Sequence, residues 1–327
     1  MFCPTALSSD DGGYAPWTPN NQGGWSHSWY ITKGRRPAQE DTLDIIHQNG
    51  VHIFAVFDGH NGWMCSKRLK ASFCKDLMAK VAPLNLGNKA QVEQVIRQEI
   101  RTFEARFKEE MVKVGNRPDG STLNVCILKG MSLTCVNIGD SRAVLVQQCQ
   151  QAVKMSDDHK PTNPSEAQRV ERAGGYIERN ANKAWRVNGI ISVSRSVGDF
   201  NIKKAKPGLI CEPDFKHMTL TQKDEYLVIA TDGLWDGLSV EDVAFYATQK
   251  AGPGAARGLV SSALARGSTD NTACIVVDVR GAFTSAPPPQ GPGAASQACA
   301  GFGRFLTECL GGGPPKNYGD YSVKGQV

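Results

Sequence analysis

Uninterrupted apolar runs mark the strands that this chain is expected to form. The clearest run is residues 51–57, a β-rich stretch that ends at Asp58 and Gly59. In the middle of the chain three such runs follow one another with little more than glycine between them, which predicts an antiparallel meander. The expected strands are residues 43–46, 51–57, 121–129, 131–138, 142–148, 226–231 and 273–279.

Amphipathic stretches predict helices between and after these strands. Apolar residues recur every four positions over residues 69–81, and at helical spacing over residues 92–114, so each set shares one face of a helix. Asn163 and Ser239 have side chains suited to helix N-caps and predict two further helices. This order of elements predicts an α+β fold, with sheets packed together and helices outside.

The two ends of the chain differ in composition from the region between them. Residues 1–23 are rich in Gly, Pro, Asn and Ser and predict an irregular arm. Residues 281–327 carry Pro-rich and Gly-rich runs, which bury little apolar surface and predict a flexible tail. Residues 24–280 are expected to form one continuous domain.

Overall composition excludes several classes of protein. The 37 basic and 32 acidic residues leave a net charge of +5, too small an excess to indicate nucleic-acid binding. No apolar run reaches 18 residues, so no membrane span is expected. Ten scattered cysteines without a C-x-x-C pair predict buried free thiols in a reducing compartment. A monomer in the cytosol or nucleus is expected.

Carboxylates stand where several predicted strands begin or end. Asp58 and Asp232 each end an apolar strand and are followed by glycine, Asp270 precedes a later strand, and Glu40 and Asp41 precede the first. Side chains at strand ends converge when the strands are neighbours. Clustered carboxylates repel one another unless cations neutralise them, and oxygen ligands suit Mg²⁺ or Mn²⁺ better than zinc.

Two ions held by such a cluster are suited to phosphate ester hydrolysis. They lower the pKa of a bound water and stabilise the phosphoryl oxygens. Arg36 lies four residues before Glu40 and has the planar guanidinium that grips phosphate. His60 follows Asp58 by two residues and has a side chain that can protonate a leaving oxygen near neutral pH. Taken alone, Arg36 is equally compatible with a surface role and His60 with a structural one.

A series of motifs over about residues 24–280 resembles the type 2C, or PPM family, of metal-dependent protein serine/threonine phosphatases. The motifs occur in the order that the family shows. They are Arg36 to Asp41, Phe57 to Gly62, Asp119 to Thr122, Asn137 to Arg142, Asp158 to Pro161, Glu171 to Gly175, Arg186 to Gly189, Ser194 to Asp199, Glu212-Pro213, Thr231 to Asp236 and Gly267 to Asn271.

This resemblance implies a four-layer α-β-β-α sandwich of two antiparallel sheets, and a binuclear Mg²⁺ or Mn²⁺ centre that acts on phosphoproteins. By similarity, Asp58 bridges both ions, Asp232 and Asp270 hold one, and Glu40 and the Gly59 carbonyl hold the other. Arg36 binds the substrate phosphate and His60 is the general acid. A third, weaker metal site corresponds to Asp140, Asp232 and Asp236.

Some positions depart from the usual family pattern. Pro37 and Gln39 lie between Arg36 and Glu40, and Pro37 fixes the local backbone. The stretch from Asp199 to Pro213 is short, and in the family this neighbourhood forms a flap beside the catalytic cleft. The resemblance therefore does not predict substrate preference.

Three alternative functions have distinct signatures. A catalytically silent pseudophosphatase that acts as a binding module lacks one or more acidic ligands, whereas all are present here. A cysteine phosphatase needs C-x5-R, a spacing that Cys274 and Arg280 have, but the residues between them include no glycine and predict a buried strand. A two-metal nuclease needs a basic groove, and the densest basic cluster near the proposed site is residues 203–206.

Overall fold

The computed structural model describes residues 13–18, 25–181, 183–249, 252 and 254–283, all within one compact unit. Two antiparallel sheets form its centre. One has the strand order β1-β2-β16-β15-β9-β10, and the other has the order β14-β8-β7-β4-β3. Their strands are β1 Gly13–Thr18, β2 Ser26–Thr32, β3 Thr42–Gln48, β4 Val51–Phe57, β7 Leu123–Lys129, β8 Ser132–Ile138, β9 Arg142–Gln147, β10 Ala152–Lys154, β14 Asp214–Thr219, β15 Asp224–Ala230 and β16 Thr272–Asp278.

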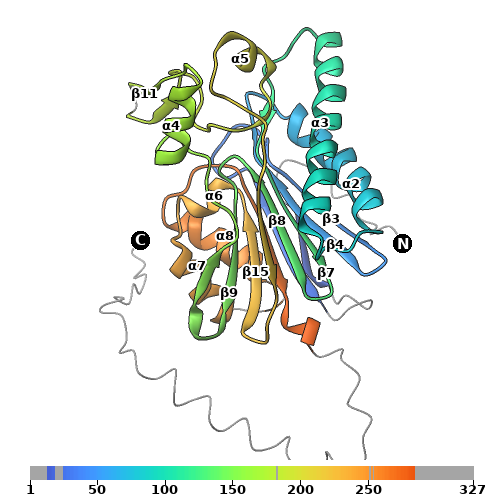
Figure 1. Cartoon of the computed structure of the whole chain (residues 1–327). Helices are drawn as coiled ribbons and strands as arrows, with labels where there is room; N and C mark the ends of the chain where they lie inside the picture. The colour runs from blue at the N-terminus through green and yellow to red at the C-terminus, as the bar shows by residue number, and fades with distance from the viewer. Residues whose placement is uncertain (1–12, 19–24, 182, 250–251, 253, 284–327) are drawn as a thin grey trace, which may run out of the picture. The chain divides into compact units, whose positions relative to one another are not determined.

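Helices cover the outer faces of both sheets. Helices α2 and α3 lie over the sheet that contains β3 and β4, and α7 and α8 lie over the sheet that contains β15 and β16 (Figure 1). The helices are α1 Met64–Arg68, the π-helical turn Leu69–Phe73, α2 Cys74–Val81, α3 Lys89–Lys113, α4 Pro164–Arg172, α5 Phe200–Ala205, α6 Asp232–Trp235, α7 Val240–Gln249 and α8 Ala255–Ala265, with 3-10 turns at Gln148–Gln150 and Arg280–Phe283. The expected α-β-β-α sandwich is confirmed.

Strand β4 shows why its sequence is apolar throughout. Val51, Ile53 and Phe57 pack with the helices, whereas Phe54 and Val56 face the other sheet. Alternate side chains of a strand point to opposite faces, so a strand buried on both faces needs apolar residues at every position. Strand β16 is built in the same way, with Ile275 between the sheets and Cys274 against α6–α8.

Small elements complete the unit beside the ends of the main sheets. A short sheet has the order β13-β6-β5, with β13 Val197–Gly198, β6 Gly120–Ser121 and β5 Gly59–His60. A separate hairpin pairs β11 Ile177–Arg179 with β12 Trp185–Val187. This hairpin shares a small apolar core with α4, whose members include Val170, Val187 and Leu209.

Two expectations need correction. The arm was expected to be irregular over residues 1–23, but Gly13–Thr18 forms β1 and pairs with β2, because the edge of β2 offers unpaired backbone groups. Free thiols are confirmed at Cys65, Cys74, Cys126, Cys135, Cys211 and Cys274, whereas Cys149 is disulfide-bonded.

The rest of the arm and residues 284–327 of the predicted tail lie outside the described residues. None of the described helices is long and apolar enough to cross a bilayer.

Candidate metal centre

One end of the β-sandwich opens into a cleft of about 340 Å³. Every residue predicted for the two-metal centre lines it, together with both predicted substrate-handling residues. These cleft residues are Arg36, Glu40, Asp58, Gly59, His60, Asp232 and Asp270. They meet there because β4, β15 and β16 carry them at strand ends that lie on the same side of the sandwich.

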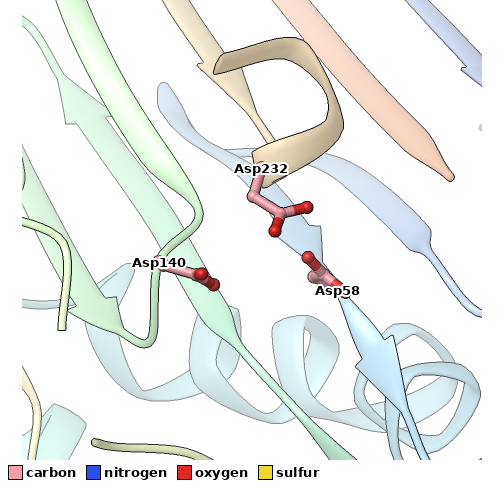
Figure 2. A group of neighbouring side chains, drawn as sticks. All are labelled: Asp58, Asp140 and Asp232. Atoms are coloured by element: carbon pink, nitrogen blue, oxygen red, sulfur yellow. The ribbon is translucent and has the colours of Figure 1, made fainter. Parts of the chain in front are cut away.

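Three carboxylates form the centre of this cleft. Carboxylate oxygens of Asp58, Asp140 and Asp232 lie within 4.8 Å of one another. Figure 2 shows Asp58 at the end of its strand facing Asp232 at the start of α6, with Asp140 directed toward both from the loop after β8. Asp140 is buried, and the other two are partly exposed to the cleft.

Desolvation and mutual repulsion make this cluster costly in its charged form. Loss of water raises the pKa of Asp58 well above its usual range, and the charges of Asp41, Asp140 and Asp270 raise it further. The pKa of Asp232 is raised well above its usual range for the same reasons, through desolvation and the charges of Asp58 and Asp140. An all-oxygen donor set that repels itself is what a hard divalent cation neutralises, so the residues fit Mg²⁺ or Mn²⁺.

The outer residues of the predicted centre are held by a neighbouring asparagine that the sequence analysis did not assign. The Asn271 side-chain oxygen accepts a hydrogen bond from the Glu40 backbone N–H at 2.8 Å. Its Nδ2 group donates to the carbonyls of Lys33 and Ala38, at 2.9 Å each. Asn271 thereby ties the loop that carries Arg36 and Glu40 to the strand that follows Asp270.

Arg36 is half exposed at the rim of the cleft. Its Nη2 donates to Asp270 Oδ2 at 2.6 Å. The structure therefore joins the predicted phosphate-binding residue directly to a predicted metal ligand. Glycine is required at position 59, because a Cβ there would lie 2.4 Å from the Glu40 carbonyl oxygen.

His60 lies on β5 and has a partner that the sequence analysis missed. Its Nε2 lies 2.7 Å from Oδ2 of Asp199, whose side chain is fully buried. Ser196 Oγ donates to the same oxygen at 2.6 Å. Burial alone would lower the pKa of His60, but the charge and hydrogen bond of Asp199 outweigh it, and the pKa is raised. The motif from Ser194 to Asp199 contained this partner, but nothing in its spacing indicated the contact.

Asp41 was expected near the first strand but was given no role at the site. It is buried, and Thr231 Oγ1 donates to its Oδ2 at 2.8 Å. Desolvation and the charges of Asp232 and Asp270 raise its pKa well above the usual range, against the hydrogen bond from Thr231. Asp41 therefore shares the unfavourable charged state of the cluster, and its charge is one of those that raise the pKa of Asp58.

The residues predicted for a third metal are only partly brought together. Asp140 and Asp232 belong to the central cluster, whereas Asp236 is exposed at the end of α6 and is not among the residues that line the cleft. Lys160 Nζ lies 3.4 Å from Asp140 Oδ2. A lysine ammonium thus already stands beside one predicted ligand of the third site.

The residues considered for a cysteine phosphatase and for a nuclease are poorly suited to those functions. Cys274 is fully buried in β16, and burial raises the pKa of its thiol far above the usual range, so it is not an activated nucleophile. In the basic cluster, Lys203 is engaged by Glu104 Oε1 at 2.8 Å and by the Ser196 carbonyl at 2.8 Å.

Comparisons with known proteins identify the family. The family model "Protein phosphatase 2C" matches residues 20–272. "Probable protein phosphatase 2C 76" of Arabidopsis thaliana is 35% identical over 285 residues, covering 85% of this chain and 65% of its own length. "Protein phosphatase 1L" of Bos taurus is 32% identical over 261 residues, covering 77% of this chain and 71% of its own length. The chain spans about two thirds of the length of such relatives.

Solved structures show the same fold. A serine-threonine phosphatase 2C from Toxoplasma gondii has a TM-score of 0.70 at 21% identity, covering 83% of this chain and 99% of that one. A sex determining protein of C. elegans has a TM-score of 0.72 at 22% identity, covering 81% of this chain and 67% of that one. This chain belongs to the protein phosphatase 2C family of protein serine/threonine phosphatases.

Proposed function

We propose that this chain removes phosphate from phosphoserine and phosphothreonine in proteins at a cleft that holds two Mg²⁺ or Mn²⁺ ions. The observation that carries the proposal is the group of three carboxylates, Asp58, Asp140 and Asp232, whose oxygens lie within 4.8 Å of one another at the base of the cleft. Ions bound there would supply the positive charge that activates a water and neutralises phosphoryl oxygens.

The proposed ligand set is the one that the family resemblance implies, and it is supported by the place of each donor in the cleft. Asp58 lies in the carboxylate cluster and would, by the family resemblance, contribute to both ions. Asp232 and Asp270 would hold one ion, and Glu40 with the Gly59 carbonyl would hold the other. All of them line the same cleft, and Asn271 fixes the spacing between the Glu40 loop and Asp270.

Arg36 is proposed to bind the substrate phosphate. Its guanidinium is 55% exposed and lies at the rim, where an entering phosphate ester can reach it. Asp270 holds one Nη2 hydrogen and thereby orients the planar group. The remaining N–H groups can donate to phosphate oxygens.

His60 is proposed to protonate the serine or threonine oxygen that leaves. A general acid must hold its proton at working pH, and the Asp199 carboxylate favours the protonated imidazole. Glycine at position 120 permits this arrangement, because a Cβ there would lie 2.1 Å from Asp199 Oδ2 and 2.4 Å from His60 Nε2. The weaker third site, the monomeric state and the cytosolic or nuclear location stay predictions.

Hydrolysis of a phosphothreonine peptide tests the proposal. We expect phosphate release with Mn²⁺ or Mg²⁺, none with excess EDTA, and none from the Asp58→Ala variant. Asp44→Asn is the matched control, because Asp44 lies on β3 and is not among the cleft-lining residues. If folded, metal-supplemented wild-type protein released no phosphate, the chain would instead be a catalytically silent binding module.

A further inference from the structure

One side of the cleft is built by the β11–β12 hairpin and the segment that follows it. Arg186 and residues 190–193 line the cleft here, with Ile190 47% exposed. This side contributes none of the predicted metal ligands. Residues next to a phosphorylated side chain that enters the cleft can therefore contact this side without displacing a metal ligand.

Among the described residues that line the cleft are two arginines, Arg36 and Arg186, and Arg186 lacks an acidic partner. Its Nε is fully buried and has no hydrogen-bond partner, and its Nη1 makes one long bond, 3.4 Å to the Ile190 carbonyl. It forms no ion pair with any residue that the structure describes. Arg36, by contrast, pairs with Asp270, and Arg195 pairs with Glu166 at 2.7 Å.

The acidic residue paired with Arg186 in the hairpin does not act as its ionic partner. Glu178 lies across from Arg186 in the hairpin, yet no hydrogen bond or ion pair joins the two side chains among the described residues. Only the Nε of this guanidinium is buried without a partner, whereas the side chain as a whole is half-exposed beside the cleft. Its unused N–H donors are suited to bind a carboxylate in two-point geometry.

The hairpin that carries Arg186 is firmly supported. Next to it, Val187 is buried in the small core under the hairpin. Asn188 accepts from the Tyr176 backbone N–H at 3.0 Å and donates to the Pro207 carbonyl at 2.8 Å. The neighbouring backbone is therefore held from both sides, which fixes the point of the cleft wall from which the Arg186 side chain extends.

We infer that Arg186 is a specificity residue that binds the carboxylate of an acidic side chain next to the phosphorylated residue of the substrate. This inference rests on the proposed phosphatase function and narrows its substrate class to phosphorylation sites flanked by Asp or Glu. Arg186 acts on the flanking residue because it lies on the hairpin side of the cleft, whereas Arg36 and the carboxylates receive the phosphate.

The test compares phosphothreonine peptides that are identical except for Glu or Gln at a position within three residues of the phosphothreonine. For each position, kcat/KM is measured for both peptides with Mn²⁺. Wild-type protein is expected to favour the Glu peptide at one position by about tenfold, the size of one charge-assisted interaction. Arg186→Gln is expected to bring this ratio to about one. Arg186→Glu is expected to favour a Lys peptide at the same position.

Arg179→Gln is the matched control. Arg179 lies on the same hairpin, stacks over Trp185 at 5.0 Å and is not among the cleft-lining residues, so its removal should keep the wild-type ratio. A wild-type ratio of one at every position would overturn the inference. So would an Arg186→Gln variant that loses activity equally on both peptides and on p-nitrophenyl phosphate, because Arg186 would then bind the phosphate that is removed. Failure of the wild-type protein to hydrolyse p-nitrophenyl phosphate with Mn²⁺ would instead refute the phosphatase function itself.

Discussion

The two ends of the β-sandwich gather titratable side chains of opposite kinds. At one end, Asp58, Asp140 and Asp232 surround the base of the cleft. At the other end, His47 and His52 face each other across the β3–β4 hairpin, with their Nδ1 atoms 2.8 Å apart. The same hairpin thus links an acidic end to a histidine end.

The histidine end is stable because its groups can be neutral. His27 lies beside His47, with ring centroids 5.4 Å apart, and Trp25 stacks on His52 at 5.1 Å. Burial, with the neighbouring histidines, lowers the pKa of His27 and of His52 to about 4. Burial also lowers the pKa of His47. Near neutral pH these three histidines therefore carry no charge that needs a partner.

The acidic end cannot become neutral without losing its metal ligands. Desolvation and repulsion raise the pKa values of the Asp58 and Asp232 carboxyl groups, because without a cation their charged forms are unfavourable. Titratable side chains of one kind are thus clustered in this protein in two ways. Histidines lose their charge, whereas carboxylates require an added cation.

His60 shows that location decides the direction of the shift. Asp199 raises the pKa of His60 at the acidic end, whereas burial among other histidines lowers the pKa of His27 at the opposite end. Histidine is thus favoured in its protonated form beside the cleft, at His60, and in its neutral form at the opposite end, at His27.

Metal removal should produce the largest difference between the two ends. With excess EDTA we expect turnover to be lost and the thermal midpoint at pH 7.5 to fall, because an ion at 100 times its Kd stabilises the fold by about 2.7 kcal/mol. The measurement is calorimetry with Mn²⁺ and with EDTA. Asp44→Asn should respond like wild type, and a midpoint indifferent to saturating Mn²⁺ would refute the requirement for a cation.

Asp199→Asn should have the next largest effect, a loss of about 10²-fold in kcat, the usual contribution of a general acid. A general acid fails as pH rises through its pKa, and removing the Asp199 charge lowers the pKa of His60. The alkaline limb of the kcat profile should therefore move to lower pH. A variant with reduced kcat but an unmoved alkaline limb would show that Asp199 serves only to support the fold.

His27→Phe should make the protein less sensitive to acid. Because the pKa of His27 is lowered from 6.5 to about 4, its folded-state neutrality supports stability above pH 6.5, and this support is lost as pH falls toward 4. At pH 5 the lost stability is about 2 kcal/mol, from about 1.4 kcal/mol per pKa unit. Urea unfolding at pH 7.5 and pH 5 should show the variant losing less stability between the two. An equal loss in both proteins would contradict the assignment.

Lys160→Gln should have the smallest effect. Lys160 stands 3.4 Å from Asp140, and the charges of Asp140 and Asp232 raise its pKa against the opposing effect of burial. Removing the positive charge of Lys160 should lower the Kd of the weakest Mn²⁺ site a few-fold, because the charge no longer repels the ion. Electron paramagnetic resonance of free Mn²⁺ measures this directly. Unchanged or weaker binding would show that Lys160 does not compete with a third ion.

The main sheets and two of the central carboxylates, Asp58 and Asp232, were predictable because strand ends are visible in the sequence, whereas Asp140 was indicated only by the family resemblance. A strand buried on both faces, such as β4, is apolar throughout, and the aspartate that follows it is conspicuous. Weakly apolar elements were not predictable. Strand β14, at the sheet edge, has only two large apolar residues, Phe215 and Met218. Strands β11 and β12 are three residues each and are supported by tertiary contacts with α4.

Partners that are distant in the sequence were also beyond prediction. His60 and Asp199 are 139 residues apart, and Glu40 and Asn271 are 231 residues apart. Neither contact follows from a local pattern, because each depends on how separate strands are placed. The histidine end was missed for the same reason, since His27 belongs to one sheet and His47 to the other.

Calorimetric titration of metal-free protein with Mn²⁺ tests the central claim most directly. Wild-type protein is expected to bind two ions, and Asp58→Asn is expected to bind them at least about 10²-fold more weakly, because a bridging carboxylate contributes to both sites. Asp44→Asn should bind as wild type does. Two undiminished sites in Asp58→Asn would contradict the claim that the carboxylates at this end of the sandwich depend on a shared, ion-bridging aspartate.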